Sequence, residues 1–238
     1  MSTEAAAPSA LFVHGAGGGG WEWTVWMRVF AAHGWRTAAP DLLPAPGGLA
    51  VTRLPDYLAQ TVAAAGALPA PRVLVGASLG GLLALMAAER VAPAALVLVN
   101  PLPPAPFAAE LPAHAPHPAI VPWGREATLA GTRRALPDAD EATCLYAFRR
   151  WRDESGAVLN AARAGVALAA PSCPRLAIAS TDDGDVPPAL TARVADAIGA
   201  DLLRVPGSHV GPLLGRQAAV VAAQTVAWLN ARAGFSRT

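Results

Sequence analysis

The sequence carries little charge. Of its 238 residues 15% are charged, and the formal net charge is +1 at pH 7. A protein that grips a nucleic acid backbone or an anionic lipid surface needs a strong positive field on one face. This composition provides no such field, so we expect neither nucleic acid nor a membrane among the partners.

Cysteines and long apolar runs are also scarce. The two cysteines, Cys144 and Cys173, match no metal-binding or redox spacing, and we interpret them as free thiols in a reducing compartment. The longest apolar region, residues 79–99, is interrupted by Glu89, Arg90 and Pro93. It therefore predicts a helix followed by a strand rather than a membrane span.

The N-terminal segment, MSTEAAAPSA, lacks the basic region of a secretory signal. We therefore expect no signal peptide and a soluble, cytoplasmic protein. Residues 14–20, HGAGGGG, lack both the Lys-Ser/Thr pair of a P-loop and the ordered G-x-G-x-x-G pattern. We therefore expect no nucleotide and no other cofactor.

Short apolar runs alternate with helix-forming segments over most of the chain. Uninterrupted apolar strands in β-α alternation predict an α/β fold, with a mostly parallel central sheet and helices on both faces. The expected strands are residues 10–13, 35–39, 73–75, 95–99, 175–180 and 201–205. The expected helices are residues 21–33, 54–66, a run starting at residue 79, 187–198 and 212–231.

A proline-rich stretch that begins after Asn100 breaks this alternation. Helical runs follow, the best of them at residues 138–153, where Asp138 and Glu141 have the spacing of a capping box. We interpret residues 101–170 as a helical cap insertion, and residues 1–100 and 171–238 as one core domain.

The sequence GASLG at residues 76–80 joins an apolar strand to a helix-forming run. A serine on such a sharp turn holds its hydroxyl clear of the backbone, beside the free N–H groups of the next helix. Ser78 is therefore a candidate nucleophile. The simpler alternative is an ordinary helix N-cap, with the glycines serving only as turn residues.

A serine nucleophile needs a base, and the base needs an orienting acid. His209 follows the last expected strand, and three aspartates, Asp182, Asp183 and Asp185, follow the strand before it. Loops at the carboxyl ends of parallel strands share one edge of the sheet, where active sites assemble. The spacing to Val186 and Pro187 favours Asp183, and the other two aspartates remain rivals.

These motifs resemble those of the α/β-hydrolase superfamily: the serine elbow at residues 76–80, the His-Gly loop at 14–17, D-x-x-V-P at 183–187 and G-x-H at 207–209. The resemblance implies Ser78 as nucleophile, His209 as general base and acid, and Asp183 as orienting acid. It also implies an oxyanion hole formed by the N–H groups of Ala16 and Leu79. We expect a trimmed version of the family fold without its usual first hairpin, and the opening HGAGGGGWEW is similar to the methylesterase and hydroxynitrile-lyase branch.

The remaining polar and aromatic side chains receive simpler interpretations. His14 is expected to brace its glycine loop, and no metal site is expected at His114 and His117, because no helix forms among the prolines. The cluster of arginines at residues 149–152 is expected on a solvated helix face, with a substrate carboxylate as an alternative partner. The side chains expected to line a substrate pocket are Trp21, Trp123, Tyr146 and Trp151.

By this resemblance we expect a serine hydrolase that cleaves a small-molecule ester or thioester of a small to medium apolar acyl group through an acyl-enzyme. An alternative uses the same residues for a non-hydrolytic elimination, as in hydroxynitrile lyases, or for C–C cleavage. A second alternative is a ligand-binding protein without catalysis. The oligomeric state is left unknown by the sequence.

Overall fold

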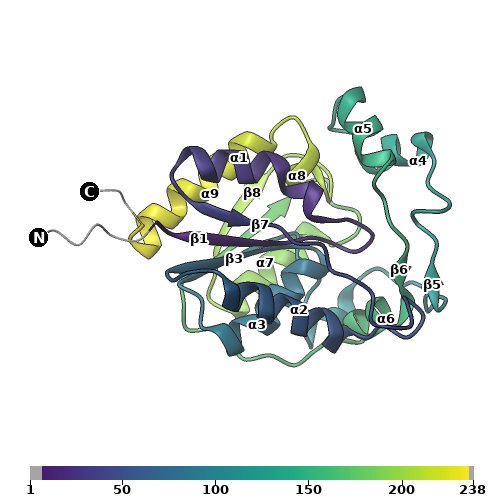
Figure 1. Ribbon diagram of the computed structural model, residues 1–238, viewed down its shortest axis with the longest axis horizontal. Coiled ribbons are helices and arrows are strands. Elements are labelled where there is room, and N and C mark those ends of the chain that lie inside the picture. Colours follow the sequence, from purple (N-terminus) through teal and green to yellow (C-terminus); the bar gives the residue numbers. More distant parts are fainter. Residues whose placement is uncertain (1–6, 236–238) are drawn as a thin grey trace, which may run out of the picture.

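The computed structural model describes residues 7–235 and contains a six-stranded sheet in the order β2-β1-β3-β4-β7-β8 (Figure 1). Every neighbouring pair in this sheet is parallel, so the expected fold class is confirmed. The strands are β1 (Ser9–Val13), β2 (Arg36–Ala38), β3 (Arg72–Ala77), β4 (Ala95–Val99), β7 (Arg175–Ser180) and β8 (Asp201–Val205).

Helices cover both faces of the sheet (Figure 1). One face carries α1 (Thr24–Ala32), α8 (Gly211–Leu214) and α9 (Ala218–Ala233), and the other carries α2 (Leu54–Ala67), α3 (Leu79–Val91) and α7 (Pro188–Ala197). Side chains alternate along each strand: Val73 and Val75 of β3 pack in the α1 and α9 layer, whereas Leu74 packs against α2 and α3. Because both faces are covered, the inner strands β1, β3, β4 and β7 are largely apolar and buried, whereas the edge strands β2 and β8 carry charged residues.

Residues 101–170, between β4 and β7, form a set of short elements outside the six-stranded sheet. We call this segment the insert. Its short strands β5 and β6 pair antiparallel, and its helix α6 packs on α2 and α3. Figure 1 shows α4 and α5 standing beside the sheet and its helices, at the end of two extended connections. The insert consists of η2 (Phe107–Glu110), β5 (Ile120–Val121), α4 (Leu129–Ala135), α5 (Glu141–Phe148), β6 (Glu154–Ser155) and α6 (Gly156–Ala164).

The helices expected at residues 138–153 and 212–231 were wrong in their bounds, and Asp138 makes a contact beside each. The helix expected at residues 138–153 is α5, and its N-cap is Asp140, whose Oδ1 accepts a hydrogen bond from the N–H of Thr143 at 2.8 Å. The helix expected at residues 212–231 is divided into α8 and α9. In the gap between them the N–H of Arg216 donates to the carbonyl of Asp138 at 3.1 Å, so Asp138 is a tertiary contact residue rather than a cap.

The helix expected at residues 21–33 begins as a 3-10 turn, η1 (Gly20–Trp23), before α1. A Cβ at Gly20 would lie 1.9 Å from the carbonyl oxygen of Ala39, so only glycine allows the chain to pass the end of β2 this closely. Within residues 7–235 no helix is both long and apolar enough to cross a bilayer.

Candidate active site

Ser78 lies on the turn between β3 and α3, with φ 52° and ψ −119°. Residues other than glycine rarely adopt a positive φ, and such a conformation persists only when surrounding contacts hold it. The N–H of Ser78 donates to Val99 at 3.0 Å, and its carbonyl accepts from the N–H of Leu102 at 3.0 Å. These two bonds tie the strained turn to the end of the neighbouring strand β4 and to the residues that follow it.

The glycines on either side of Ser78 are required by close packing. A Cβ at Gly76 would lie 2.1 Å from the carbonyl oxygen of Gly80, and a Cβ at Gly80 would lie 2.1 Å from that of Val13. Since neither neighbour is a flexible side chain, strand and helix approach this closely only with glycine at both positions.

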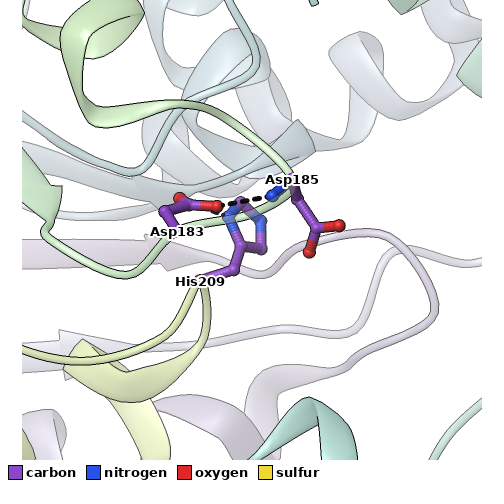
Figure 2. A group of neighbouring side chains, drawn as sticks. All are labelled: Asp183, Asp185 and His209. Carbon is purple, nitrogen blue, oxygen red and sulfur yellow. Dashed lines mark hydrogen bonds and ion pairs between the residues drawn. The ribbon is translucent and has the colours of Figure 1, made fainter. Parts of the chain in front are cut away.

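The ring of His209 meets Asp183 (Figure 2): Nδ1 lies 2.7 Å from Oδ2. The other carboxylate oxygen of Asp183 accepts hydrogen bonds from the N–H groups of Asp185 and Val186, both at 2.9 Å. The Asp183 side chain is fully buried, whereas Asp182 and Asp185 are exposed. Of the three rival aspartates, the structure therefore pairs Asp183 with the imidazole.

The surroundings of His209 favour its charged form. Burial by itself lowers the pKa of His209, but the hydrogen bond and charge of Asp183, with the charges of Asp185 and Glu22, outweigh burial and leave this pKa raised. The His209 backbone is also held, because its carbonyl accepts from Asn100 Nδ2 at 2.7 Å. The site thus stabilises an imidazolium ion and limits movement of its loop.

Ser78 and His209 line the same cavity of about 600 Å³. Within residues 7–235 no hydrogen bond joins the Ser78 hydroxyl to the His209 ring in this structure. Hydrogen bonds between catalytic groups are often long without substrate and tighten when it binds. The structure therefore brings the two groups to one cavity, and their direct contact belongs to the functional proposal.

The two backbone positions expected to bind an oxyanion lie next to this cavity. Ala16 lines it, and Leu79 is the first residue of α3, where a backbone N–H has no partner within the helix. Both N–H groups belong to segments that meet Ser78. Leu79 follows Ser78 directly in the chain, and in the loop that contains Ala16 a Cβ at Gly15 would lie 3.4 Å from the Cβ of Ser78.

His14 braces the glycine loop, as expected. Its Nδ1 donates to the carbonyl of Gly15 at 2.8 Å, and its Nε2 accepts from the N–H of Leu42 at 2.8 Å and faces Arg152 Nη2 at 3.1 Å. Burial lowers the pKa of His14 to about 4, so the ring is neutral at pH 7. A neutral ring with one donor and one acceptor satisfies all of these contacts.

The insert holds the same loop through two residues that sequence reasoning missed. The N–H of Gly17 donates to Glu154 Oε2 at 3.0 Å, and Arg152 Nε donates to the carbonyl of Gly18 at 2.6 Å. Arg152 therefore points to the loop, not to a solvated face. No sequence signal marks these contacts, because each joins residues more than 130 positions apart.

Asp138 makes a comparable contact to the histidine loop. Its Oδ2 accepts from the N–H of Ser208 at 2.9 Å, and its Oδ1 accepts from the Ser208 hydroxyl at 2.8 Å. A Cβ at Gly207 would lie 2.4 Å from this carboxylate, and one at Gly211 would lie 2.0 Å from it. The glycines around His209 thus make room for an acid from the insert.

Glu22 is a further buried acid that sequence reasoning missed. It is 3% exposed, accepts from the N–H of Gly15 at 3.3 Å, and fills the space where Gly18 lacks a side chain. Burial raises the pKa of Glu22 to about 8. An acid between two tryptophans directly after the glycine loop was the available signal.

We expect Glu22→Gln to remove a pH dependence of stability. The folded carboxyl has a pKa of about 8 and the ordinary value is 4.5, so between these values the folded chain keeps a proton that the unfolded chain releases. The stabilisation is complete below pH 4.5 and is lost as pH rises through about 8, by at most about 1.4 kcal/mol per pH unit. Urea unfolding at pH 5, 6.5 and 8 measures this loss.

In E22Q the free energy of unfolding should fall less between pH 5 and pH 8 than in the wild type. The exposed Glu126 supplies the control, because E126Q should follow the wild-type slope. Parallel curves for E22Q and the wild type would show that Glu22 titrates as an ordinary surface acid.

Two of the four aromatic residues expected in the pocket line the cavity. Trp123 and Trp151 do so, whereas Trp21 and Tyr146 are not among its lining residues. The Trp21 ring packs instead on Trp151 at 5.2 Å and on Tyr146 at 5.7 Å between centroids, and Arg150 stacks on Tyr146 at 3.7 Å. Trp21 therefore packs against a ring that lines the cavity, Trp151, and Tyr146 packs against Trp21.

Asp183, Asp185 and His209 are the one group in residues 7–235 whose ligand atoms lie close enough together to hold a metal ion. Both oxygens of Asp183 already accept hydrogen bonds, one from the imidazole and two from backbone N–H groups. The arrangement therefore fits a hydrogen-bonded acid and base better than a set of metal ligands.

The fold and this geometry define a class of protein: an open parallel sheet with a serine on the strained turn after a central strand, and an Asp-His pair on later loops of the same edge. The sequence model described as the Alpha/beta hydrolase family matches residues 10–224. The chain therefore belongs to the α/β-hydrolase family. No curated protein matches it.

Several solved structures share the fold. A structure from work on the metagenome-derived lipolytic enzymes LipS and LipT is 21% identical, with 94% of each chain covered and a TM-score of 0.70. Polyneuridine aldehyde esterase is 17% identical, with 92% of this chain and 99% of that chain covered and a TM-score of 0.71. Tomato methylketone synthase I bound to 2-tridecanone is 18% identical, with 95% and 99% covered and a TM-score of 0.74.

Proposed function

We propose that this protein is a serine hydrolase that cleaves a small-molecule carboxylic ester or thioester through an acyl-enzyme. The observation that carries the proposal is that Ser78, on a strained strand-to-helix turn, and His209, paired with the buried Asp183, line one cavity. Family membership and the esterases and lipolytic enzymes of similar fold support it.

In this mechanism His209 Nε2 removes the proton of the Ser78 hydroxyl as the oxygen attacks the carbonyl carbon. Asp183 holds the ring through Nδ1 and stabilises the imidazolium. The N–H groups of Leu79 and Ala16 stabilise the tetrahedral oxyanion, each by about 3 to 4 kcal/mol in enzymes of this type. His209 then protonates the leaving alcohol or thiol, and water releases the acid in a second attack.

The cavity suits a small to medium acyl group. Its apolar lining includes Leu102, Trp123, Trp151, Leu159 and Val186, and such walls bind an acyl chain through burial of apolar surface. We take residues 101–170 as the cap of this site, since most of these side chains belong to the insert. The protein acts without a cofactor in this proposal.

A second candidate function is a non-hydrolytic reaction in which His209 acts as a base toward the substrate. The observation that favours it is that His209, paired with Asp183, itself lines the cavity, so its ring is accessible to a bound substrate. One protein of similar fold, methylketone synthase I, has a name that does not describe an esterase.

A fluorophosphonate probe and a matched set of p-nitrophenyl esters and thioesters test the two candidates. Labelling of Ser78 together with ester or thioester turnover is the result expected for the hydrolase. Labelling without turnover of any ester or thioester would favour the second candidate. Neither labelling nor turnover would contradict both and leave a ligand-binding protein.

A further inference from the structure

The insert brings a group of basic side chains into the cavity that Ser78 and His209 share. His114, His117 and Arg163 all line it. The two imidazole rings stack with centroids 4.3 Å apart and an interplanar angle of 28°. The pKa of His117 is lowered first by burial and then by the positive charges of His114 and Arg163, so the three groups lie close enough to repel one another.

Acidic partners are missing from this group. Within residues 7–235 no carboxylate forms an ion pair with His114, His117 or Arg163, and no acid is among the charges that shift the pKa of His117. Glu126 and Asp185 also line the cavity, as does Arg134, but the charge of Asp185 acts on His209. The charges that act on His209 are therefore carboxylates, whereas those that act on His117 belong to basic groups.

The basic group is held in place by specific contacts. The N–H of His117 donates to Asn160 Oδ1 at 2.9 Å, and Asn160 Nδ2 donates back to the His117 carbonyl at 3.1 Å. Arg163 Nη2 donates to the carbonyl of Pro112. A Cβ at Gly156 would lie 1.7 Å from the carbonyl oxygen of Pro118, so the proline-rich segment sits directly on α6. A bound anion would therefore meet the Arg163 guanidinium and the two imidazole rings as N–H donors that these contacts hold together in the cavity.

We propose that His114, His117 and Arg163 form a subsite for an anionic group of the substrate, a carboxylate or a phosphate, outside the scissile ester or thioester. The proposal rests on the proposed function, because it places that anion on a molecule attacked by Ser78. Arg163 uses one N–H for Pro112 and retains further donors in a planar fork that fits either group. The substrate class is then an acidic ester or thioester rather than a fully neutral one.

The test compares kcat/KM for p-nitrophenyl esters of matched acyl length: a hemiglutarate with a free carboxylate, its methyl-capped neutral form, and an analogue that ends in phosphate. The wild type should prefer an anionic ester by roughly ten- to a hundredfold, the range expected for one charge-assisted contact. The preferred anion distinguishes carboxylate from phosphate.

Substitution locates the preference. R163Q should reduce the ratio of anionic to neutral kcat/KM to near one, and R163K should retain part of the ratio. H114A should also lower the ratio of anionic to neutral kcat/KM. Because this substitution leaves the Asn160 contacts of His117 in place, a lower ratio in both variants would not be due to a general loss of folding in R163Q. Arg193, a surface residue outside the cavity, is the matched control, because R193Q should keep the wild-type ratio.

Equal turnover of neutral and anionic esters by the wild type would overturn the subsite and leave the hydrolase intact. A measurement independent of turnover separates the two proposals. Monomethyl glutarate should bind the Ser78→Ala variant in calorimetry and bind its R163Q double variant at least tenfold more weakly, whereas equal binding by both would also overturn the subsite. Loss of all ester and thioester hydrolysis together with Arg163-dependent binding would contradict the proposed function and retain the anion site.

Discussion

Ser78→Ala is expected to reduce kcat for ester hydrolysis by roughly 10⁴- to 10⁶-fold, the range for loss of a serine nucleophile. The hydroxyl is the atom that forms the acyl bond, and only the oxyanion N–H groups and the binding cavity remain to assist water. The fluorophosphonate probe should no longer label the variant. Single-turnover kinetics with the best ester of the panel, beside circular dichroism to verify folding, measures the effect.

Ser208 offers a matched control for this substitution. It is a buried serine next to His209, and its hydroxyl donates to Asp138 at 2.8 Å, so Ser208→Ala removes a hydroxyl near the same ring without removing the nucleophile. We expect a loss of about tenfold or less, since the variant keeps the nucleophile, the His209–Asp183 pair and the bond from the Ser208 N–H to Asp138. Near wild-type turnover by Ser78→Ala would contradict the proposed mechanism.

The strain at Ser78 separates its chemical role from its structural one. Because φ is 52°, glycine tolerates the turn better than alanine, and Ser78→Gly should unfold with a free energy about 1 to 2 kcal/mol higher than Ser78→Ala. Both variants should be inactive. The difference would show that the turn is kept strained for the hydroxyl and not for stability.

Asp183→Asn is expected to lower kcat by about 10⁴-fold, as when the acid of such a triad is replaced by its amide. The amide has no negative charge with which to stabilise the imidazolium, and its donor group favours the wrong ring tautomer. The pKa of His209, raised mainly by Asp183 against the effect of burial, should then fall. The acidic limb of the pH profile of kcat/KM should move to lower pH, because the ring loses its proton at lower pH.

The neighbouring aspartates are built-in controls for Asp183. Asp182 and Asp185 are exposed and follow the same strand, so Asp182→Asn should leave kcat unchanged. Asp185→Asn should lower the pKa of His209 slightly, since the Asp185 charge contributes to it, with less than a tenfold change in kcat. If Asp185→Asn were as damaging as Asp183→Asn, the hydrogen bond at 2.7 Å would not identify the orienting acid.

Parts of the fold that depend on local pattern were predicted closely. The bounds expected for β4, β7 and β8 agree with the structure. Strands β4 and β7 are apolar runs, almost entirely buried and enclosed by turn residues, whereas β8, at the edge of the sheet, is mostly only partly buried. The bounds of α5 and the division between α8 and α9 were wrong. Asp138 makes tertiary contacts beside both places, to Ser208 and to Arg216, and no local pattern encodes a contact between residues about 70 positions apart.

The sequence by itself determined the alternation that makes the sheet parallel, the glycines that allow the turn at Ser78, and the order in which Ser78, Asp183 and His209 follow their strands. Tertiary structure alone decided which aspartate meets His209, that Glu22, Arg152 and Glu154 support the glycine loop, and which aromatic rings reach the cavity. The reason is physical. Strand and turn formation follow from side chains a few residues apart, whereas burial and hydrogen bonding across the insert depend on how distant segments pack.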